Sequence, residues 1–115
     1  MSFPEDVIDK SQYDELVGEG GTEFFSEMIE LYEEHIPAII DQLIEASKGS
    51  DTGMVKELAH SIKGSAANIG VKTVFNLSKE LELGSSSMAP DEIIETASKI
   101  KAEFERSIPI LKSLV

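Results

Sequence analysis

The sequence contains no cysteine and no tryptophan, and few prolines. The absence of cysteine excludes disulfides and thiolate chemistry, and it fits a cytoplasmic protein. No apolar run approaches the roughly 18 residues of a membrane span, and residues 1–6 have neither the basic start nor the apolar stretch of a secretory signal. We therefore expect a cytoplasmic protein without a membrane segment.

Basic residues are also scarce: 10 Lys and Arg stand against 22 Asp and Glu, for a net charge of −12. Nucleic acids and anionic membrane surfaces are bound through basic patches, so neither is an expected partner. The charge is unevenly distributed, because no acidic residue lies between Leu58 and Lys79 whereas Lys63 and Lys72 do. This predicts an island of positive potential that suits an acidic or phosphorylated partner, unless the gap arose by chance.

Helical periodicity is the only regular pattern in the chain. Apolar residues recur at three- and four-residue steps, and no alternating run rich in Val, Ile or Thr stands between turn pairs. The length suits one domain with a single core, which we place over residues 1–115. The predicted fold class is therefore all-α.

Five helical segments can be placed along the chain. We expect a short helix over 11–17 and longer helices over 22–44, 51–69, 72–83 and 90–108. Pro37 should bend the long second helix, Pro109 should fray or end the last one, and residues 84–87 should form a plain loop. Short joins between four substantial helices predict an antiparallel up-down four-helix bundle, with the short N-terminal helix as a lid on one end.

The helix predicted over 51–69 carries a lone histidine on its polar side. At about 100° per residue, five apolar residues of this segment fall within about 40° of one line and form a core stripe. They are Val55, Ala59, Ile62, Ala66 and Ile69. His60 lies about 140° from that line. Lys56, Lys63, Gly64 and Ala67 share its outward face, so the imidazole has cations and nearly bare backbone one turn away on either side.

This arrangement has the parts of a phosphoryl acceptor. A neutral imidazole has a nucleophilic nitrogen that can attack phosphorus in line, and a nearby cation such as Lys63 can stabilise the phosphoryl oxygens. A glycine inside a helix costs about 1 kcal/mol relative to alanine, and clearance for a docking partner would explain Gly64. The alternative is that His60 is an ordinary solvated histidine beside a tolerated glycine.

Other catalytic arrangements find little support. The two histidines, His35 and His60, have no His-Glu-x-x-His spacing and no cysteine beside them, so they do not indicate a catalytic metal site. We interpret His35, which lies among acidic residues just before Pro37, as a surface or structural residue. The glycines within 18–21 lack the Lys-Ser/Thr of a phosphate-binding loop and indicate a turn.

The segment Ala59–Gly70, which reads AHSIKGSAANIG, resembles the His-x-x-Lys-Gly core of the histidine-containing phosphotransfer (HPt) domains of two-component phosphorelays. The similarity extends to Phe24-Phe25 at the start of a long helix, to the proline near its middle, to Gly49 before the histidine helix and to residues 77–82 after it. It therefore covers nearly the whole chain.

The resemblance implies a bundle in which His60 accepts a phosphoryl group at Nε2 from a phospho-aspartate of a response regulator receiver domain and passes it to another receiver. It implies no kinase or phosphatase activity in the chain itself, and no cofactor other than Mg²⁺ on the partner receiver. The expected partners are receiver domains and a hybrid sensor histidine kinase. We expect the protein to be a monomer.

The resemblance also assigns roles to single residues. His60 would be phosphorylated, Lys63 would be the cation and Gly64 the clearance position. Glu82 takes the place of the polar side chain that hydrogen-bonds the imidazole, where many relay members have Gln and the phosphoacceptor domain of chemotaxis histidine kinases has Glu. Such a carboxylate would fix the tautomer that leaves Nε2 free. Lys79, one turn earlier, would be a second phosphate neighbour; both residues could instead be solvated helix positions.

Three functions follow from these observations. The first is a free-standing phosphorelay carrier, which we favour because the chain begins with Met and shows no second domain. The second is the phosphoacceptor domain of a larger kinase of the chemotaxis or hybrid type, which Glu82 favours. The third is a helical interaction module in which His60 is inert, and it predicts that His60→Ala leaves partner binding and signalling unchanged.

Overall fold

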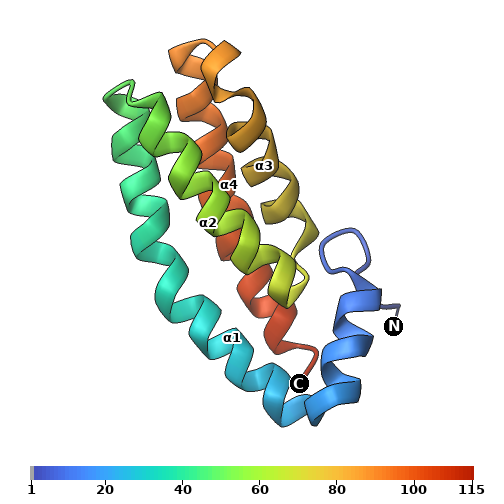
Figure 1. Ribbon diagram of the computed structural model, residues 1–115. Coiled ribbons are helices and arrows are strands. Elements are labelled where there is room, and N and C mark those ends of the chain that lie inside the picture. The colour runs from blue at the N-terminus through green and yellow to red at the C-terminus, as the bar shows by residue number, and fades with distance from the viewer. Residues whose placement is uncertain (1) are drawn as a thin grey trace.

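The computed structural model describes residues 2–115, which form an elongated bundle of about 42 × 24 × 20 Å. Its elements are α1 (Lys10–Lys48), α2 (Thr52–Ile69), α3 (Lys72–Gly84), a 3-10 turn η1 (Ser85–Ser87) and α4 (Pro90–Lys112). Figure 1 shows the four helices running up and down with short joins at the ends. The all-α, antiparallel four-helix architecture predicted from the periodicity is confirmed.

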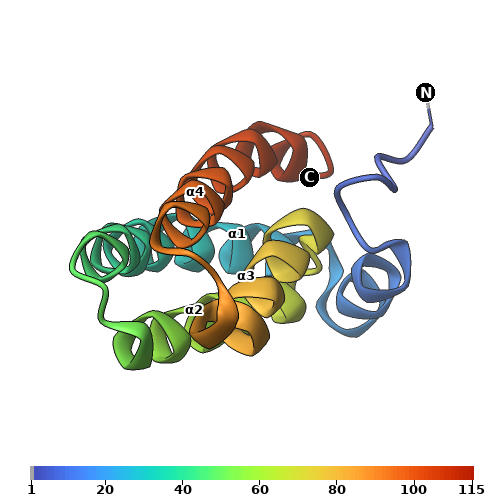
Figure 2. The same cartoon turned by 90° about the horizontal axis from the view of Figure 1, so that it is seen from above.

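The helices are arranged so that α2 and α4 lie on opposite corners of the bundle. α2 packs against α1 and α3, and α4 packs against the same two helices. The view along the bundle in Figure 2 shows α2 and α4 on opposite sides. The outer faces of α2 and α4 therefore point in different directions, and only the outer face of α2 carries His60.

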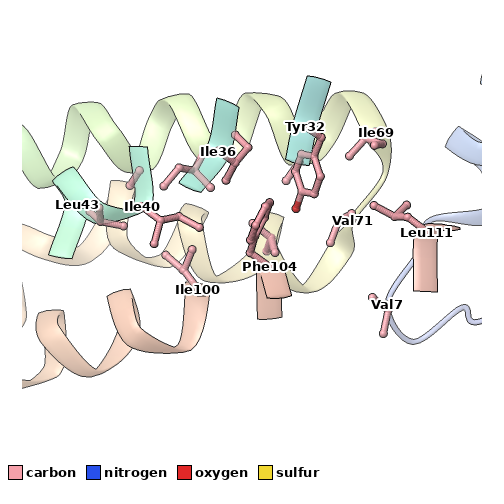
Figure 3. Packing of buried hydrophobic residues seen from close by; sticks show 14 of the residues in the cluster. Val7, Tyr32, Ile36, Ile40, Leu43, Ile69, Val71, Ile100, Phe104 and Leu111 are labelled. Atoms are coloured by element: carbon pink, nitrogen blue, oxygen red, sulfur yellow. The ribbon is translucent and has the colours of Figure 1, made fainter. Parts of the chain in front are cut away.

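The core is apolar along the whole length of the bundle. Figure 3 shows Ile36, Ile40 and Leu43 of α1 facing Ile100 of α4. Nearer the other end, the rings of Tyr32 and Phe104 lie with their centroids 5.0 Å apart. The stripe predicted on the histidine helix belongs to this core, because all five of its residues are at most 1% exposed. The stripe thus fixes the rotation of α2 and turns its opposite face to solvent.

α1 has one break in its helical geometry, at Gly21. Gly21 has φ 75° and ψ −176°, outside the helical region, and this break separates the predicted short N-terminal helix from the long one. A side chain other than hydrogen would be strained there, whereas Gly18 and Gly20 stay within the helix. Pro37 lies inside the long segment, which continues to Lys48, as predicted.

The short N-terminal helix lies over the α2–α3 turn as a lid. The backbone N–H of Asp9 donates to the carbonyl of Gly70, and that of Lys72 donates to the carbonyl of Val7. The Gln12 side chain donates to the carbonyl of Asn68 at 2.7 Å. These bonds hold the C-terminal end of α2, the helix that carries His60.

Two expectations about the C-terminal half were wrong. Pro109 does not end the last helix, which runs to Lys112, because Leu111 is fully buried and its packing outweighs the one backbone bond that proline cannot make. Residues 85–87 form the turn η1 instead of a plain loop, and Ser85 is buried there.

Candidate functional site

α2 is defined at both ends by the residues that flank it. The Asp51 side chain caps the first turn by accepting a hydrogen bond from the N–H of Met54 at 3.1 Å. Gly70 ends the helix in the left-handed conformation at φ 88°, which favours glycine. Between these ends the helix is regular, so His60 lies in mid-helix with its side chain 72% exposed.

Glu82 of α3 bridges His60 and Lys63 of α2. One carboxylate oxygen of Glu82 bonds Nδ1 of His60, and the other accepts a hydrogen bond of 2.5 Å from Nζ of Lys63. The side chains of Glu82 and Lys63 are only 11% and 24% exposed, so this ion pair lies against the bundle while the imidazole stands out from it. The predicted contact between Glu82 and His60 is present.

The Glu82 carboxylate is held in its charged form. The hydrogen bond from Lys63 is the main influence that lowers the pKa of Glu82; partial burial opposes it, and His60 adds to the lowering. An ionised carboxylate can only accept hydrogen bonds, so the shared proton belongs to Nδ1 of His60. In the neutral imidazole this tautomer leaves Nε2 with its lone pair.

Gly64 leaves the helix surface beside His60 open. A Cβ built at Gly64 meets no atom within 4 Å, so internal packing does not require a glycine at this position. Lys79 is exposed on α3, and within residues 2–115 it makes no ion pair or side-chain hydrogen bond with His60, Lys63 or Glu82. The structure therefore brings His60, Lys63, Gly64 and Glu82 together, and the role of Lys79 as a second phosphate neighbour stays a prediction.

The imidazole borders an open hollow of about 760 Å³ that sequence reasoning did not foresee. Two exposed apolar side chains line it, Met54 at 43% exposure and Leu83 at 69%. Glu57 lines it as well. The surface around His60 therefore includes acidic side chains, although the sequence between Leu58 and Lys79 has none.

His35 is the second histidine, and it is placed differently. Its Nδ1 donates to the carbonyl of Leu31 within the same helix at 2.8 Å, and no lysine pairs with it in the described part of the chain. Residues 2–115 bring no three His, Asp or Glu side chains into a metal-binding group. Within the same residues, no helix is both long and apolar enough to cross a membrane.

Comparison with known proteins agrees with this geometry. The chain matches the sequence profile of the Hpt domain over residues 27–108, which contain all of the site described above. It also superposes on the histidine-containing phosphotransfer domain of ArcB from Escherichia coli with a TM-score of 0.87 and 19% sequence identity, covering 98% of this chain and 96% of that one. No curated protein sequence matches. With its helical bundle and an exposed histidine in mid-helix, the chain belongs to the Hpt domain family, the histidine-containing phosphotransfer modules of two-component signalling.

Proposed function

We propose that this protein is a phosphoryl carrier that receives its phosphoryl group on Nε2 of His60 from the phospho-aspartate of one receiver domain and passes it to another. The observation that supports this most directly is the bond from Nδ1 of His60 to the Glu82 carboxylate, on a side chain that is otherwise exposed. In transfer, the Nε2 lone pair forms a bond to phosphorus while the bond from phosphorus to the aspartate oxygen breaks. The aspartate leaves as a carboxylate.

Glu82 contributes through the charge that the ring acquires. When Nε2 of a neutral imidazole bonds to phosphorus, positive charge develops on the ring and the N–H at Nδ1 becomes a stronger donor. The Glu82 carboxylate, already bonded to Nδ1, stabilises that charge without reorganising. In the reverse step the ring returns to its neutral form as the phosphoryl group leaves.

Lys63 contributes to the phosphoryl oxygens. Its ammonium is bonded to Glu82 at 2.5 Å, and it lies one helical turn from His60. An ammonium has three donors, so Lys63 can keep its bond to the carboxylate and still donate to a phosphoryl oxygen. In this proposal the carrier itself neither uses ATP nor hydrolyses the phosphoryl group, and the Mg²⁺ needed for transfer is bound by the partner receiver. We expect a receiver and a hybrid sensor histidine kinase as partners, and a monomer.

The test is label transfer from a phosphorylated receiver domain with Mg²⁺, and separately from phosphoramidate, a small donor that needs no docking. Three chains are compared: the wild type, His60→Gln, and His35→Gln as the matched control on the other histidine. We expect acid-labile, alkali-stable label on the wild type from both donors and on His35→Gln from phosphoramidate, and none on His60→Gln from either donor.

Two outcomes would contradict the proposal. Label on His60→Gln would move the acceptor to another residue. Label from phosphoramidate but from none of a broad panel of receivers would show a reactive histidine without the relay partners, and would favour a module that binds without transferring. Unfolding of His60→Gln should match the wild type, because the side chain lies outside the core.

A second candidate is the phosphoacceptor domain of a larger histidine kinase. The observation that favours it is the carboxylate of Glu82 at the imidazole, since the phosphoacceptor domain of chemotaxis kinases has Glu at this position. The two candidates differ in the donor. If the chain is a phosphoacceptor domain, a kinase domain with ATP would label His60 faster than a phosphorylated receiver does. If it is a phosphorelay carrier, the phosphorylated receiver would be the faster donor.

A further inference from the structure

Residues 2–20 form an N-terminal arm that is turned back against one end of the bundle. Figure 1 shows this arm in blue beside the turn that joins α2 to α3. Its apolar side chains belong to the core, because Val7 is 1% exposed, Ile8 0% and Leu16 7%. Ile8 also forms an isolated antiparallel bridge with Val71. The arm therefore fills a socket on the bundle, which consists of the α2–α3 turn and the buried residues beside it.

The arm is joined to the long part of α1 through a segment that contains three glycines, and one of them holds the bend. Gly21 has φ 75° and ψ −176°, a region that essentially only glycine occupies. The backbone is helical on both sides of it. Helical angles at Gly21 would turn α1 into one straight helix of about 58 Å and would direct the arm away from its own bundle.

Gly20 is fitted to the bent form and not to a straight helix. A Cβ built at Gly20 would lie 2.5 Å from the Cβ of Phe24, closer than real atoms approach. In a regular helix, residues four apart keep their Cβ atoms about 5–6 Å apart, so this crowding belongs to the bend. A Cβ built at Gly18 meets no atom of the described residues within 4 Å. Glycine is thus required at 20 and 21 by the bent form alone, and at 18 by neither form.

Straightening α1 would break a contact that only a second chain could restore. The ring of Tyr13 packs edge-on against that of Phe25, with the centroids 5.1 Å apart. Twelve residues separate the two, which is about 18 Å along a straight helix, so one straight α1 cannot make this contact. Phe25 is fully buried, and opening would uncover it together with the socket. A second copy of the chain carries the same arm and fits the same socket.

We infer that this chain forms a dimer by arm exchange, in which residues 2–20 of each copy fill the socket of the other and α1 is straight. The closed monomer and this dimer have the same arm contacts, and they differ in the hinge and in the cost of association. An arm tethered to its own bundle has an effective concentration of about 1 mM. The monomer is therefore the form at low concentration, and the dimer forms as the chain concentration approaches that value.

Arm exchange leaves the histidine site complete in each bundle. The hydrogen bonds from the arm to α2 reach Asn68 and Gly70, at the C-terminal end of the helix. Asn68 lies eight residues after His60, about 12 Å along the helix axis. The dimer therefore joins two bundles, each with its own exposed His60, into one particle.

The first experiment measures the oligomeric state of the full chain by size-exclusion chromatography with light scattering. The wild type is refolded from denaturant at about 1 µM and at about 1 mM, on either side of the concentration at which exchange competes. Salt of about 0.3 M screens the repulsion between chains of net charge −12. We expect a monomer at the low concentration and a substantial fraction of dimer at the high one. A wild type that is only monomeric after refolding at about 1 mM would overturn the inference.

Alanine variants of the hinge provide the matched comparison. Gly20→Ala and Gly21→Ala should dimerise at concentrations at least about tenfold lower than the wild type, because both strain the bent form and both suit a straight helix. Gly18→Ala is the control, because this position is helical in both forms, and it should dimerise as the wild type does. Equal dimerisation of Gly18→Ala and Gly21→Ala, or folded Gly21→Ala that stays monomeric throughout, would contradict the role of the bend.

The second experiment identifies the contacts within the dimer. Isotope-labelled and unlabelled wild-type chains are refolded together in equal amounts, and isotope-filtered NMR then detects only the contacts between different chains. We expect contacts between Tyr13 and Phe25 and between Ile8 and Val71 in this spectrum. A dimer that makes these contacts only within each chain has another interface, and it would overturn arm exchange.

Labelling by phosphoramidate separates this inference from the proposed function. The isolated dimer should accept as much label per chain as the monomer does, since each bundle keeps its own His60. A dimer that takes no label while the monomer is labelled would overturn the statement that exchange leaves the site complete. Absence of label on both forms would contradict the proposed function, whereas the oligomeric state and the contacts between chains decide arm exchange without reference to phosphoryl transfer.

Discussion

The ammonium of Lys63 donates a hydrogen bond of 2.5 Å to Glu82, and the same carboxylate bonds Nδ1 of His60. The cation and the nucleophile of the site are therefore coupled through one acidic side chain. A change at Glu82 can therefore act on the ring tautomer, on the position of Lys63, or on both.

Glu82→Gln should make the phosphohistidine shorter-lived. The amide oxygen can still accept from Nδ1 of His60, so the tautomer persists, but the carboxylate charge that stabilises the positively charged, phosphorylated ring is lost. We expect decay and onward transfer to become about fivefold faster. Glu82→Ala, which also removes the acceptor, should reduce phosphorylation by phosphoramidate. Equal lifetimes for Glu82→Gln and the wild type would show that the carboxylate charge is not felt at the phosphoryl group.

Lys63→Ala should slow phosphorylation of His60 about tenfold or more without abolishing it. The nucleophile remains, but a donor to the phosphoryl oxygens is lost and Glu82 loses the partner that lowers its pKa. Single-turnover transfer from one receiver measures the effect, with Lys63→Arg as the variant that keeps the charge. Wild-type rates in Lys63→Ala would remove Lys63 from the transfer chemistry.

Gly64→Ala and Gly64→Gln should both stabilise the fold, by about 1 kcal/mol, because a helical glycine with open space at its Cβ is replaced by better helix formers. Only the long side chain should obstruct docking, so receiver transfer should be lost in Gly64→Gln and kept in Gly64→Ala. Chemical unfolding and receiver transfer test this together, with Ala102→Gln on the exposed face of α4 as control. A Gly64→Gln protein that exchanges phosphate at the wild-type rate would contradict the clearance role.

Acid should weaken the link between α2 and α3. Because the pKa of Glu82 is lowered in the fold, the ion pair with Lys63 contributes its full stability above the ordinary glutamate pKa of about 4.3 and loses it as the pH falls through the lowered value. Unfolding of the wild type and Glu82→Gln should differ most at neutral pH and converge in acid. A Glu82 titration midpoint at or above the ordinary value, followed by carboxyl NMR, would refute the coupling.

The fold was largely predictable from the chain, and so were most of the site residues. The apolar spacing of α2 identified its buried face and thereby the exposure of His60. Gly70 and the break near Gly21 marked helix ends because these backbone conformations favour glycine. The prediction that Pro109 ends or frays the last helix was wrong. The last turn is held in place by the burial of Leu111, which depends on the packing of the whole bundle and cannot be seen in the local sequence.

By itself, the sequence determined which residues face outward on α2, because 3.6 residues per turn relate sequence spacing directly to direction around one helix. It thus specified His60, Lys63 and Gly64 as neighbours. Only the tertiary structure decided what α3 and α1 contribute, since the rotation and height of one helix against another depend on how their core side chains interlock. That packing brings Glu82 between His60 and Lys63, and sets Leu31 beside Asn68 in an open groove.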